Sequence, residues 1–371
     1  MNKVLFVIDQ IKSGGAEKIL LEFNQYLLDH NYITQIHTLY DEPSRNSHNF
    51  LEKLKQQVNQ YYQLKKICRQ FSPDVVFSFL DRSNVIVSML AGPFVRILTV
   101  HNILSIQYRK LPGCLQWIVR QIIRYTYNRK RQSVVAVSNM VRDDLQDSFG
   151  VKKYIEVINN YVDKDKLIRS SNESITEIDL KSETKYILNV GRFTIQKAQW
   201  KIIKAIAYIQ LKYNRKVALI LLGEGELKAQ LQALSENLGV ADRIAILPFN
   251  PNPYKFMSKC DMFVLPSLYE GAPIVLSEII ALERPFIGSS KAVPRELFGD
   301  DETAYCQSTF VNTHIEPDFS EQIYDDDMLL GDKIFNVLFE SKDQSVLGCQ
   351  NWNKKNYKST QFNEYLKLFK A

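Results

Sequence analysis

Short runs rich in valine, isoleucine and phenylalanine alternate along this chain with amphipathic stretches of helical length. Runs that are apolar on both faces are typical of parallel strands in sheets that helices cover on both sides. The first half contains such runs at residues 3–8, 33–39, 74–79, 95–100, 133–137 and 154–158. The second half contains them at 186–190, 217–222, 243–247, 262–266 and 285–288, and helices are expected between them, for example at 16–29 and 50–70. The pattern predicts two Rossmann-like, doubly wound α/β domains.

The length of 371 residues is sufficient for two domains of ordinary size. Residues 163–185 are polar and contain no strand-like apolar run, so we interpret them as an interdomain connection that can hold a short helix. We expect a first domain at 1–165, a linker at 166–184 and a second domain at 185–345. We expect residues 346–371 to form a helical segment that packs back toward the first domain.

The cysteine count indicates the cellular compartment. Five cysteines form no C-x-x-C pair, which favours reduced thiols in a cytosolic protein over disulfides or a zinc site. The apolar run at residues 4–8 is too short for a signal peptide, and no stretch approaches the roughly 20 apolar residues of a membrane-spanning helix. We predict a cytoplasmic protein, either soluble or peripheral on the inner face of the membrane.

The net charge of +6 is unevenly distributed. Residues 82–142 contain ten lysines and arginines and no acidic residue. A region of one sign indicates an anionic partner, which could be nucleic acid, a phosphorylated substrate or an acidic membrane surface.

Two glutamates lie eight positions apart in residues 267–285. Glu270 falls in a predicted strand-to-helix loop beside Gly271, and Glu278 lies in an apolar helix that Pro273 would open. Amide groups at the start of that helix would favour an anion. A carboxylate among aliphatic residues needs partners, which could be sugar hydroxyls or a neighbouring arginine or lysine.

Further segments accompany these glutamates in a recognisable order. They are GGAE (14–17), TVHN (99–102), VAVSNMVRDDL (135–145), VINNYVD (157–163), NVGRFTIQK (189–197), LLGEGEL (221–227) and PFNPNPYKFMSKCDMFVLPS (248–267). Together with the E-x7-E spacing of Glu270 and Glu278, the chain resembles retaining glycosyltransferases of family four, which have the GT-B fold with two domains facing a central cleft. It departs from their pattern at Tyr161, at Pro248 and at Glu283 or Arg284.

The resemblance implies roles for individual residues. Arg192 and Lys197 would stabilise the leaving diphosphate, Glu270 would contact the donor sugar, and Glu278 would hold the ribose hydroxyls. His101 would contact the transferred sugar from the first domain. The implied donor-binding residues are Gly14, Gly15, Gly223, Phe249, Asn250, Gly271, Ala272, Pro273 and Glu278.

The resemblance also implies the donor and the absence of a metal. The donor would be a nucleotide sugar, and family habit favours UDP over GDP. The acidic run at 325–327 could be mistaken for a D-x-D metal site, but it is better interpreted as the start of a helix. We expect no cofactor and no essential metal.

Residues 108–132 combine basic, aromatic and aliphatic side chains. On a helix from about residue 115, Trp117, Ile118, Ile122 and Tyr125 recur at three- and four-residue steps, and we expect some of them to belong to the core. The candidate acceptor or membrane residues are Arg109, Lys110, Arg120 and Arg124. They would suit anionic phospholipids or a polyprenyl-diphosphate sugar. The alternative is a core helix with a solvated basic face. No nucleic-acid motif is recognisable, so we expect no such partner.

The predicted function is transfer of a hexose or N-acetylhexosamine from a nucleotide diphosphate sugar to a glycan or lipid-linked acceptor. Bacterial surface polysaccharides, such as capsule, O-antigen or lipopolysaccharide, are the expected context. Two alternatives stay open: a nucleotide-sugar epimerase of the same fold, and a non-catalytic partner subunit of another transferase.

Overall fold

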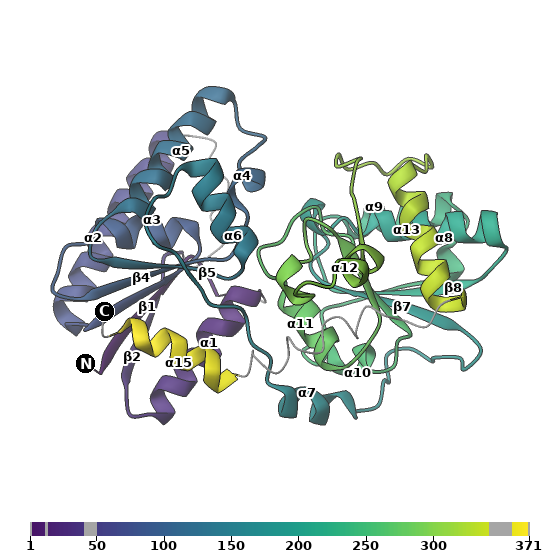
Figure 1. Cartoon of the computed structure of the whole chain (residues 1–371), viewed down its shortest axis with the longest axis horizontal. Helices are drawn as coiled ribbons and strands as arrows, with labels where there is room; N and C mark the ends of the chain where they lie inside the picture. The colour runs from purple at the N-terminus through teal and green to yellow at the C-terminus, as the bar shows by residue number, and fades with distance from the viewer. Residues whose placement is uncertain (1, 12–13, 41–49, 341–357, 370–371) are drawn as a thin grey trace. The chain divides into compact units, whose positions relative to one another are not determined.

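The computed structural model describes residues 2–11, 14–40, 50–340 and 358–369. The chain forms two compact units, and the first combines Met1–Asn160 with the C-terminal Ser359–Ala371. The second unit is Tyr161–Lys358. Each unit is built on one six-stranded sheet with flanking helices (Figure 1).

The sheet of the first unit is parallel throughout, with the strand order β2-β1-β3-β4-β5-β6. The direction of winding reverses at β1, which lies between β2 and β3. Its strands are β1 (Lys3–Ile8), β2 (Ile33–Thr38), β3 (Val75–Phe79), β4 (Val95–Val100), β5 (Gln132–Ala136) and β6 (Glu156–Val157).

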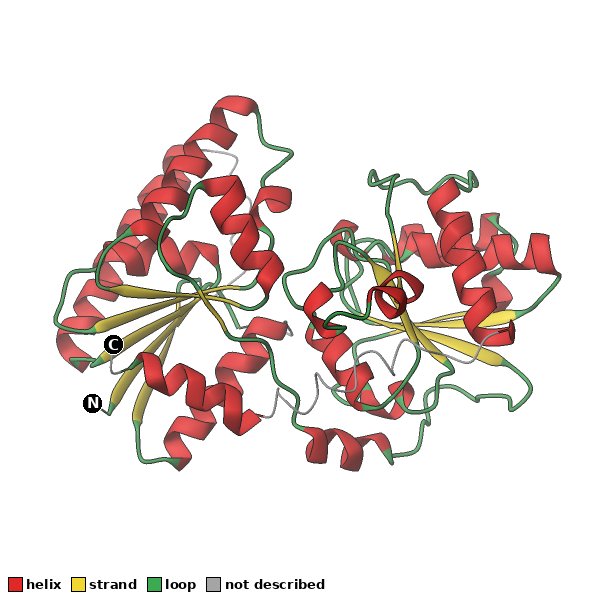
Figure 2. Cartoon of the chain, viewed as in Figure 1, coloured by secondary structure: helices red, strands yellow, loops and turns green. Residues whose placement is uncertain are grey.

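Helices cover both faces of this sheet, as Figure 2 shows. They are α1 (Gly15–Asp29), α2 (Phe50–Phe71), α3 (Asp81–Met89), α4 (Leu104–Gln107), α5 (Gly113–Asn128), α6 (Asn139–Asp143), the π-helical turn η1 (Asp144–Ser148) and α15 (Lys358–Leu368). Phe23 of α1 packs against Phe6 and Phe77 of the sheet and also against Phe362 and Tyr365 of α15. The C-terminal helix therefore completes the core of the first unit.

The sheet of the second unit is also parallel, with the order β12-β11-β10-β7-β8-β9. Winding reverses between the neighbouring strands β7 and β10. The strands are β7 (Lys185–Val190), β8 (Val217–Leu222), β9 (Ile244–Leu247), β10 (Met262–Leu265), β11 (Phe286–Ser289) and β12 (Thr309–Phe310).

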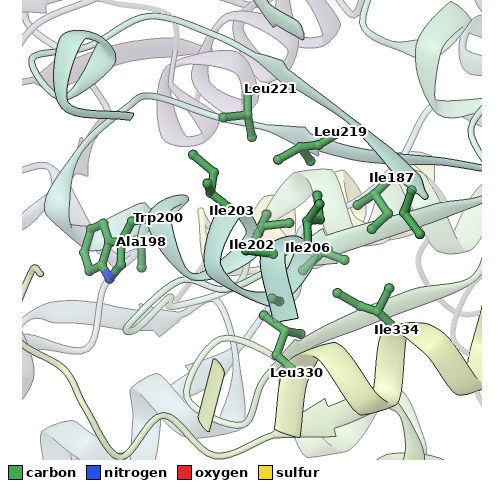
Figure 3. Packing of buried hydrophobic residues seen from close by; sticks show 14 of the residues in the cluster. Ile187, Ala198, Trp200, Ile202, Ile203, Ile206, Leu219, Leu221, Leu330 and Ile334 are labelled. Carbon is green, nitrogen blue, oxygen red and sulfur yellow. The ribbon is translucent and has the colours of Figure 1, made fainter. Parts of the chain in front are cut away.

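Two apolar clusters cover the two faces of the second sheet, because successive strand residues point to opposite sides. Ile187 belongs to one cluster and Leu188 to the other. Figure 3 shows the first cluster, where Trp200 and Ile203 of α8 and Leu330 of α13 pack with residues of the sheet. The helices and short turns are α7 (Lys164–Ser171), η2 (Ile195–Lys197), α8 (Trp200–Tyr213), α9 (Lys228–Asn237), η3 (Ala241–Arg243), α10 (Tyr254–Met257), α11 (Ile274–Ala281), η4 (Arg295–Leu297), α12 (Glu302–Ser308), α13 (Asp325–Phe335) and η5 (Asn336–Glu340).

The predicted doubly wound architecture is confirmed, and all the predicted strands form within two residues of their expected limits. The short strand β12 was not predicted, because Thr309 and Phe310 do not lie in a longer run of strand-forming apolar residues. The structure starts the second unit at Tyr161, before the expected boundary at residue 165. Residues 166–184 also belong to this unit, because Leu167 of α7 is buried in its core.

Two further observations bear on the expected compartment. Cys68, Cys114, Cys260 and Cys306 are free, and Cys349 lies outside the described residues. Of the helices in the described ranges, none is both long and apolar enough to cross a bilayer.

Residues 346–357 of the expected C-terminal segment also lie outside the described part of the chain.

Candidate active site

The predicted donor-site residues follow neighbouring strands of the second sheet. Arg192 and Lys197 come after β7, and Glu270 comes after β10. These two strands pair directly, and the winding of the sheet reverses between them. In open α/β sheets, ligands bind outside the carboxyl ends of the strands at such a reversal.

Lys197 and Glu270 form an ion pair, with Nζ 2.6 Å from Oε1. Their side chains are 18% and 9% exposed, so the pair is largely shielded from water. Backbone contacts join the two loops, since the amide of Leu268 donates to the Gln196 carbonyl at 2.8 Å. Gln196 Nε2 in turn donates to the Tyr269 carbonyl at 3.0 Å. The loops therefore hold the pair in place. Lys197 keeps two further N–H groups that could reach an anion.

Arg192 is exposed, and its guanidinium has no hydrogen-bond or ion-pair partner within the described ranges. Its backbone is fixed nevertheless, because buried Gln199 donates from Nε2 to the Arg192 carbonyl at 3.0 Å. The sequence analysis did not single out Gln199. A fixed backbone with an unpaired guanidinium is suited to bind an anionic ligand.

Gly223 allows the loops after β7 and β8 to approach closely. A Cβ at Gly223 would lie 2.1 Å from the Gly191 carbonyl oxygen, and one at Gly225 would lie 2.3 Å from the Phe193 oxygen. Real side chains do not tolerate such distances to a backbone atom. Gly223 was predicted to bind the donor. The structure shows that a glycine is needed at this position for close packing against Gly191, which directly precedes Arg192.

Glu278 is buried on α11, where the Tyr254 hydroxyl donates to its Oε1 at 3.0 Å. Pro273 stands at the N-cap position of this helix, directly after Gly271 and Ala272. Sequence analysis did not identify Tyr254, although it lies in a segment that carries the family resemblance. The open question about Glu278 therefore has a partial answer: its partners include a tyrosine.

The loop after β9 contains Phe249 and Asn250, two of the donor-binding residues that the resemblance implies. Phe249 is 53% exposed there, whereas Asn250 donates from Nδ2 to Glu177 Oε1 at 2.7 Å. Lys255 donates to the same oxygen at 2.7 Å, and this hydrogen bond lowers the pKa of Glu177 to about 2. Asn250 thus ties the loop to the segment after α7 and is not a freely available side chain.

Gly14, Gly15 and His101 lie in the first unit. Gly14 is the N-cap residue of α1, and Gly15 is its first residue. His101 follows β4, with its Nε2 3.0 Å from Thr99 Oγ1 and its ring stacked on Phe79. Burial lowers the pKa of His101 to about 4, so the ring is neutral at neutral pH.

A carboxyl group that the sequence analysis missed lies at the winding reversal of the first sheet. Asp9 directly follows β1, and its Oδ1 accepts hydrogen bonds from the Ser83 amide at 3.0 Å and the Ser83 hydroxyl at 2.6 Å. Burial raises the pKa of Asp9 to about 6. No motif marks this residue, and only the pairing of β1 with β3 brings it to Ser83.

The basic segment forms α5, which begins at Gly113. Its buried residues include Ile123 and Tyr127. The predicted stripe is not core: the exposed apolar residues are Leu115, Trp117, Ile118, Ile122 and Tyr125. The expectation that part of the stripe is buried was therefore wrong, because the neighbouring residues of the helix supply its inward face. Arg109 and Arg120 line one pocket, and Lys110 and Arg124 are not among its lining residues.

The acidic run begins α13, as predicted, with Asp325 as the first residue. Asp326 and Asp327 are buried, and both lie within ion-pair distance of Lys201 Nζ, at 2.8 and 3.5 Å. Within the described part of the chain, no group of three or more histidine, cysteine, aspartate or glutamate side chains could hold a metal ion.

Two doubly wound parallel sheets, with the Lys197–Glu270 ion pair at the carboxyl edge of the second, define a protein of the GT-B fold. Residues 13–166 match the family model Glycosyltransferase Family 4, and residues 170–314 match the model Glycosyl transferases group 1. The chain belongs to the family 4 glycosyltransferases.

A curated relative supports this assignment over most of the chain. It is the N-acetylgalactosamine-N,N'-diacetylbacillosaminyl-diphospho-undecaprenol 4-alpha-N-acetylgalactosaminyltransferase of Campylobacter jejuni, which is 32% identical over 322 residues. The alignment covers 81% of this chain and 85% of the relative.

Solved structures share the fold at low sequence identity. Sucrose-phosphate synthase from Thermosynechococcus elongatus has a TM-score of 0.80 at 14% identity, covering 100% of this chain and 98% of that one. Anabaena Alr3699/HepE in complex with UDP has a TM-score of 0.69 at 16% identity, covering 98% of both chains.

Proposed function

We propose that this glycosyltransferase moves a hexose or N-acetylhexosamine from a UDP-sugar to a glycan or polyprenyl-diphosphate-linked acceptor, with retention of configuration. The observation that carries the proposal is the shielded Lys197–Glu270 pair at the winding reversal of the second sheet. Arg192 lies five residues before Lys197, and its guanidinium has no partner among the described residues. The bound UDP of the Anabaena structure and the lipid-linked acceptor in the name of the Campylobacter relative support the choice of substrates.

The cations act on the leaving group. Negative charge grows on the departing diphosphate as the bond to the sugar breaks, so positive groups fixed there stabilise the transition state more than the ground state. Lys197 donates one N–H to Glu270 and retains two for phosphate oxygens. Glu270 thereby orients Lys197 while its own oxygens remain near the donor sugar.

Glu278 binds the ribose hydroxyls in this proposal. An ionised carboxylate accepts several hydrogen bonds, so one oxygen can take the Tyr254 hydroxyl while the group still receives sugar hydroxyls. Tyr254 is then a positioning residue, because it acts on the ribose only through Glu278.

The acceptor attacks on the face from which the diphosphate leaves, and the leaving phosphate takes the acceptor proton. No carboxylate then needs to act as a covalent nucleophile, which fits Glu270 being paired with Lys197. Neutral His101 hydrogen-bonds the transferred sugar. We propose that these protein groups suffice without a metal, so activity should survive an excess of EDTA.

The proposed setting is the cytoplasmic face of a membrane. The exposed apolar residues of α5, with basic residues on the same helix, resemble a surface that rests on anionic lipid. Flotation with phosphatidylglycerol vesicles at low salt tests this. Failure to float would remove the membrane from the proposal and leave the transfer reaction.

The reaction is tested by thermal shift and turnover. UDP at 100 times its dissociation constant should stabilise the second unit by about 2.7 kcal/mol, and GDP should do less. Product formation from UDP-sugars should require both donor and acceptor. Turnover of donor alone would indicate an epimerase, and Glu278→Ala with unchanged UDP binding would contradict the proposed donor site.

A further inference from the structure

A pocket of about 320 Å³ lies in the first unit between α4 and α5. Its volume lies within the range of small-molecule sites. The lining residues include Tyr108, Arg109, Trp117 and Arg120, with Ser148 and Phe149 from the end of η1. The proposed transfer chemistry uses none of these side chains.

Within the described part of the chain, the two arginines of this pocket have no counter-ion. Neither the half-buried Arg109 nor the exposed Arg120 has a side-chain hydrogen bond or ion pair with any residue in the described ranges. Asp144, an acid of η1, accepts hydrogen bonds from the Ser105 amide and the Ser148 hydroxyl, both at 3.1 Å. Two guanidinium groups on one pocket without a carboxylate partner favour a ligand with phosphate oxygens.

The pocket is held together before any ligand arrives. Gln116 of α5 donates from Nε2 to the carbonyls of Arg109 and Leu111, at 2.7 and 2.8 Å, and so fastens the connection before the helix to the helix itself. The Tyr108 hydroxyl donates to Asp81 at the start of α3. Because the backbone at Arg109 is fixed, less ordering is needed when an anion binds.

Apolar side chains continue from the pocket along α5. Trp117 lines the pocket and is 64% exposed. Leu115, Ile118 and Ile122 are also exposed on this helix. A ligand that fits this neighbourhood carries a phosphate group and a hydrocarbon chain on one molecule.

We propose that the pocket binds the diphosphate of a prenyl-diphosphate-linked acceptor, with phosphate oxygens on Arg109 and Arg120 and the first isoprene units against Trp117. The inference rests on the proposed function, because it assigns an acceptor to the same enzyme. It divides the four predicted basic residues: Arg109 and Arg120 contact the diphosphate, and Lys110 and Arg124 do not.

The test measures binding of farnesyl diphosphate to the full chain by calorimetry. Saturating UDP is present, so that the donor site does not take up the probe. Arg109→Ala and Arg120→Ala should each weaken binding by about tenfold or more, since a hydrogen bond to a charged group is lost. Trp117→Ala should weaken the binding of farnesyl diphosphate but leave the binding of inorganic pyrophosphate unchanged.

Arg124→Ala is the matched control, one helical turn from Arg120 and outside the pocket lining. The Kd of Arg124→Ala for farnesyl diphosphate should stay within about twofold of the wild-type value. A general effect of surface charge would instead weaken binding equally in Arg120→Ala and Arg124→Ala, and that result would overturn the proposal. Unchanged UDP binding and melting temperature in all variants would show that the fold is intact. If UDP binds and farnesyl diphosphate does not, the pocket assignment fails while the proposed function stands.

The source of the phosphate is tested separately. Glycerol phosphate, the soluble head group of phosphatidylglycerol, should not compete with farnesyl diphosphate for the pocket. Competition that disappears in Arg109→Ala and Arg120→Ala would assign the pocket to a phospholipid head group and overturn the acceptor assignment. Farnesol, which lacks the diphosphate, should bind at least about tenfold more weakly than farnesyl diphosphate.

Discussion

Lys197 and Lys201 stand four residues apart, yet they have different surroundings. Lys197 pairs with Glu270 at the carboxyl edge of the second sheet, and its side chain keeps some exposure. Lys201 is 1% exposed and lies between α8 and α13 with Asp326 and Asp327. A charge at the sheet edge can exchange its partner for a ligand, whereas a fully buried charge depends on the acids that the fold supplies.

The buried cluster of Lys201, Asp326 and Asp327 also has more hydrogen bonds than the Lys197–Glu270 pair. Burial opposes the charge on Asp326, but the hydrogen bond from Lys201 and those from the amides of Thr313 and His314 keep the pKa of Asp326 below its usual value. The comparison indicates that Lys201 serves stability and Lys197 serves catalysis. The following predictions test that difference.

The largest effect is expected for Lys201→Met. Removing this ammonium leaves two buried carboxylates without their cation, which should lower the free energy of unfolding of the second unit by about 3–5 kcal/mol. Urea unfolding would measure it. Lys212→Met is the control on the same helix, because its pair with Asp332 is exposed to solvent and its loss should cost far less stability than the loss of Lys201. Equal losses in the two variants would contradict the comparison.

Lys197→Ala should reduce kcat by about 10²–10³ because it removes one fixed cation from the leaving diphosphate. Its unfolding free energy should change far less than that of Lys201→Met. Steady-state kinetics and urea unfolding on the same preparation would separate the two effects. A variant that unfolds as easily as Lys201→Met would make the Lys197–Glu270 pair structural instead.

Among the described residues, Asp9 has hydrogen-bond partners but no directly bonded cation. Burial therefore raises the pKa of Asp9, whereas the pKa of Asp326 is lowered. The folded pKa of Asp9, about 6, lies above the unfolded value of 3.8, so its stabilising contribution is full below pH 3.8 and is lost as the pH rises through 6. The wild type should therefore lose about 2.4 kcal/mol relative to Asp9→Asn between pH 4 and pH 7. Unfolding of both proteins across this range would measure the difference.

The groups that interact with Asp9 include Asp81, Arg82 and Ser83, and also Tyr40 and Tyr127. His101 provides a control of opposite sign, because its lowered pKa removes stability as the pH falls from 6.5 towards 4. His101→Gln should accordingly gain stability relative to wild type at the acid end. Parallel pH profiles for Asp9→Asn and wild type would refute the assignment to Asp9.

Tyr254→Phe should have the smallest effect. The variant loses one hydrogen bond from a neutral hydroxyl to the Glu278 carboxylate, which is worth about 1 kcal/mol. The Kd for UDP should therefore rise about fivefold. Tyr213→Phe, which loses a bond to Asp332 instead, should not change UDP binding. If Tyr254→Phe binds UDP as wild type does, Tyr254 does not position Glu278 for the ribose.

Much of this arrangement follows from local sequence. The strands were predictable because residues apolar on both faces are covered by helices on both sides, and the places of Arg192, Lys197 and Glu270 follow from the strands that precede them. What the sequence could not supply are contacts across sheet neighbours. Asp9 meets Ser83 only because β1 pairs with β3, and Tyr254 meets Glu278 through packing of α10 and α11.

The outward stripe of α5 was misjudged for a related reason. Periodicity shows that Ile118 and Ile122 share a face, but it cannot tell which face of the helix meets the sheet. Ile123 and Tyr127 take the inward positions instead. Likewise, the packing requirement at Gly223 became apparent only with the carbonyl of Gly191 in place.

The C-terminal helix has a practical consequence for dissecting the protein. The chain leaves the first unit after Asn160 and returns to it at Ser359, where Phe362 and Tyr365 cover Phe23. A truncated protein that ends after Asn160 would lack these two aromatic residues, and Phe23 would then be exposed to solvent. An isolated first unit should therefore be expressed with residues 359–371 grafted back through a short linker.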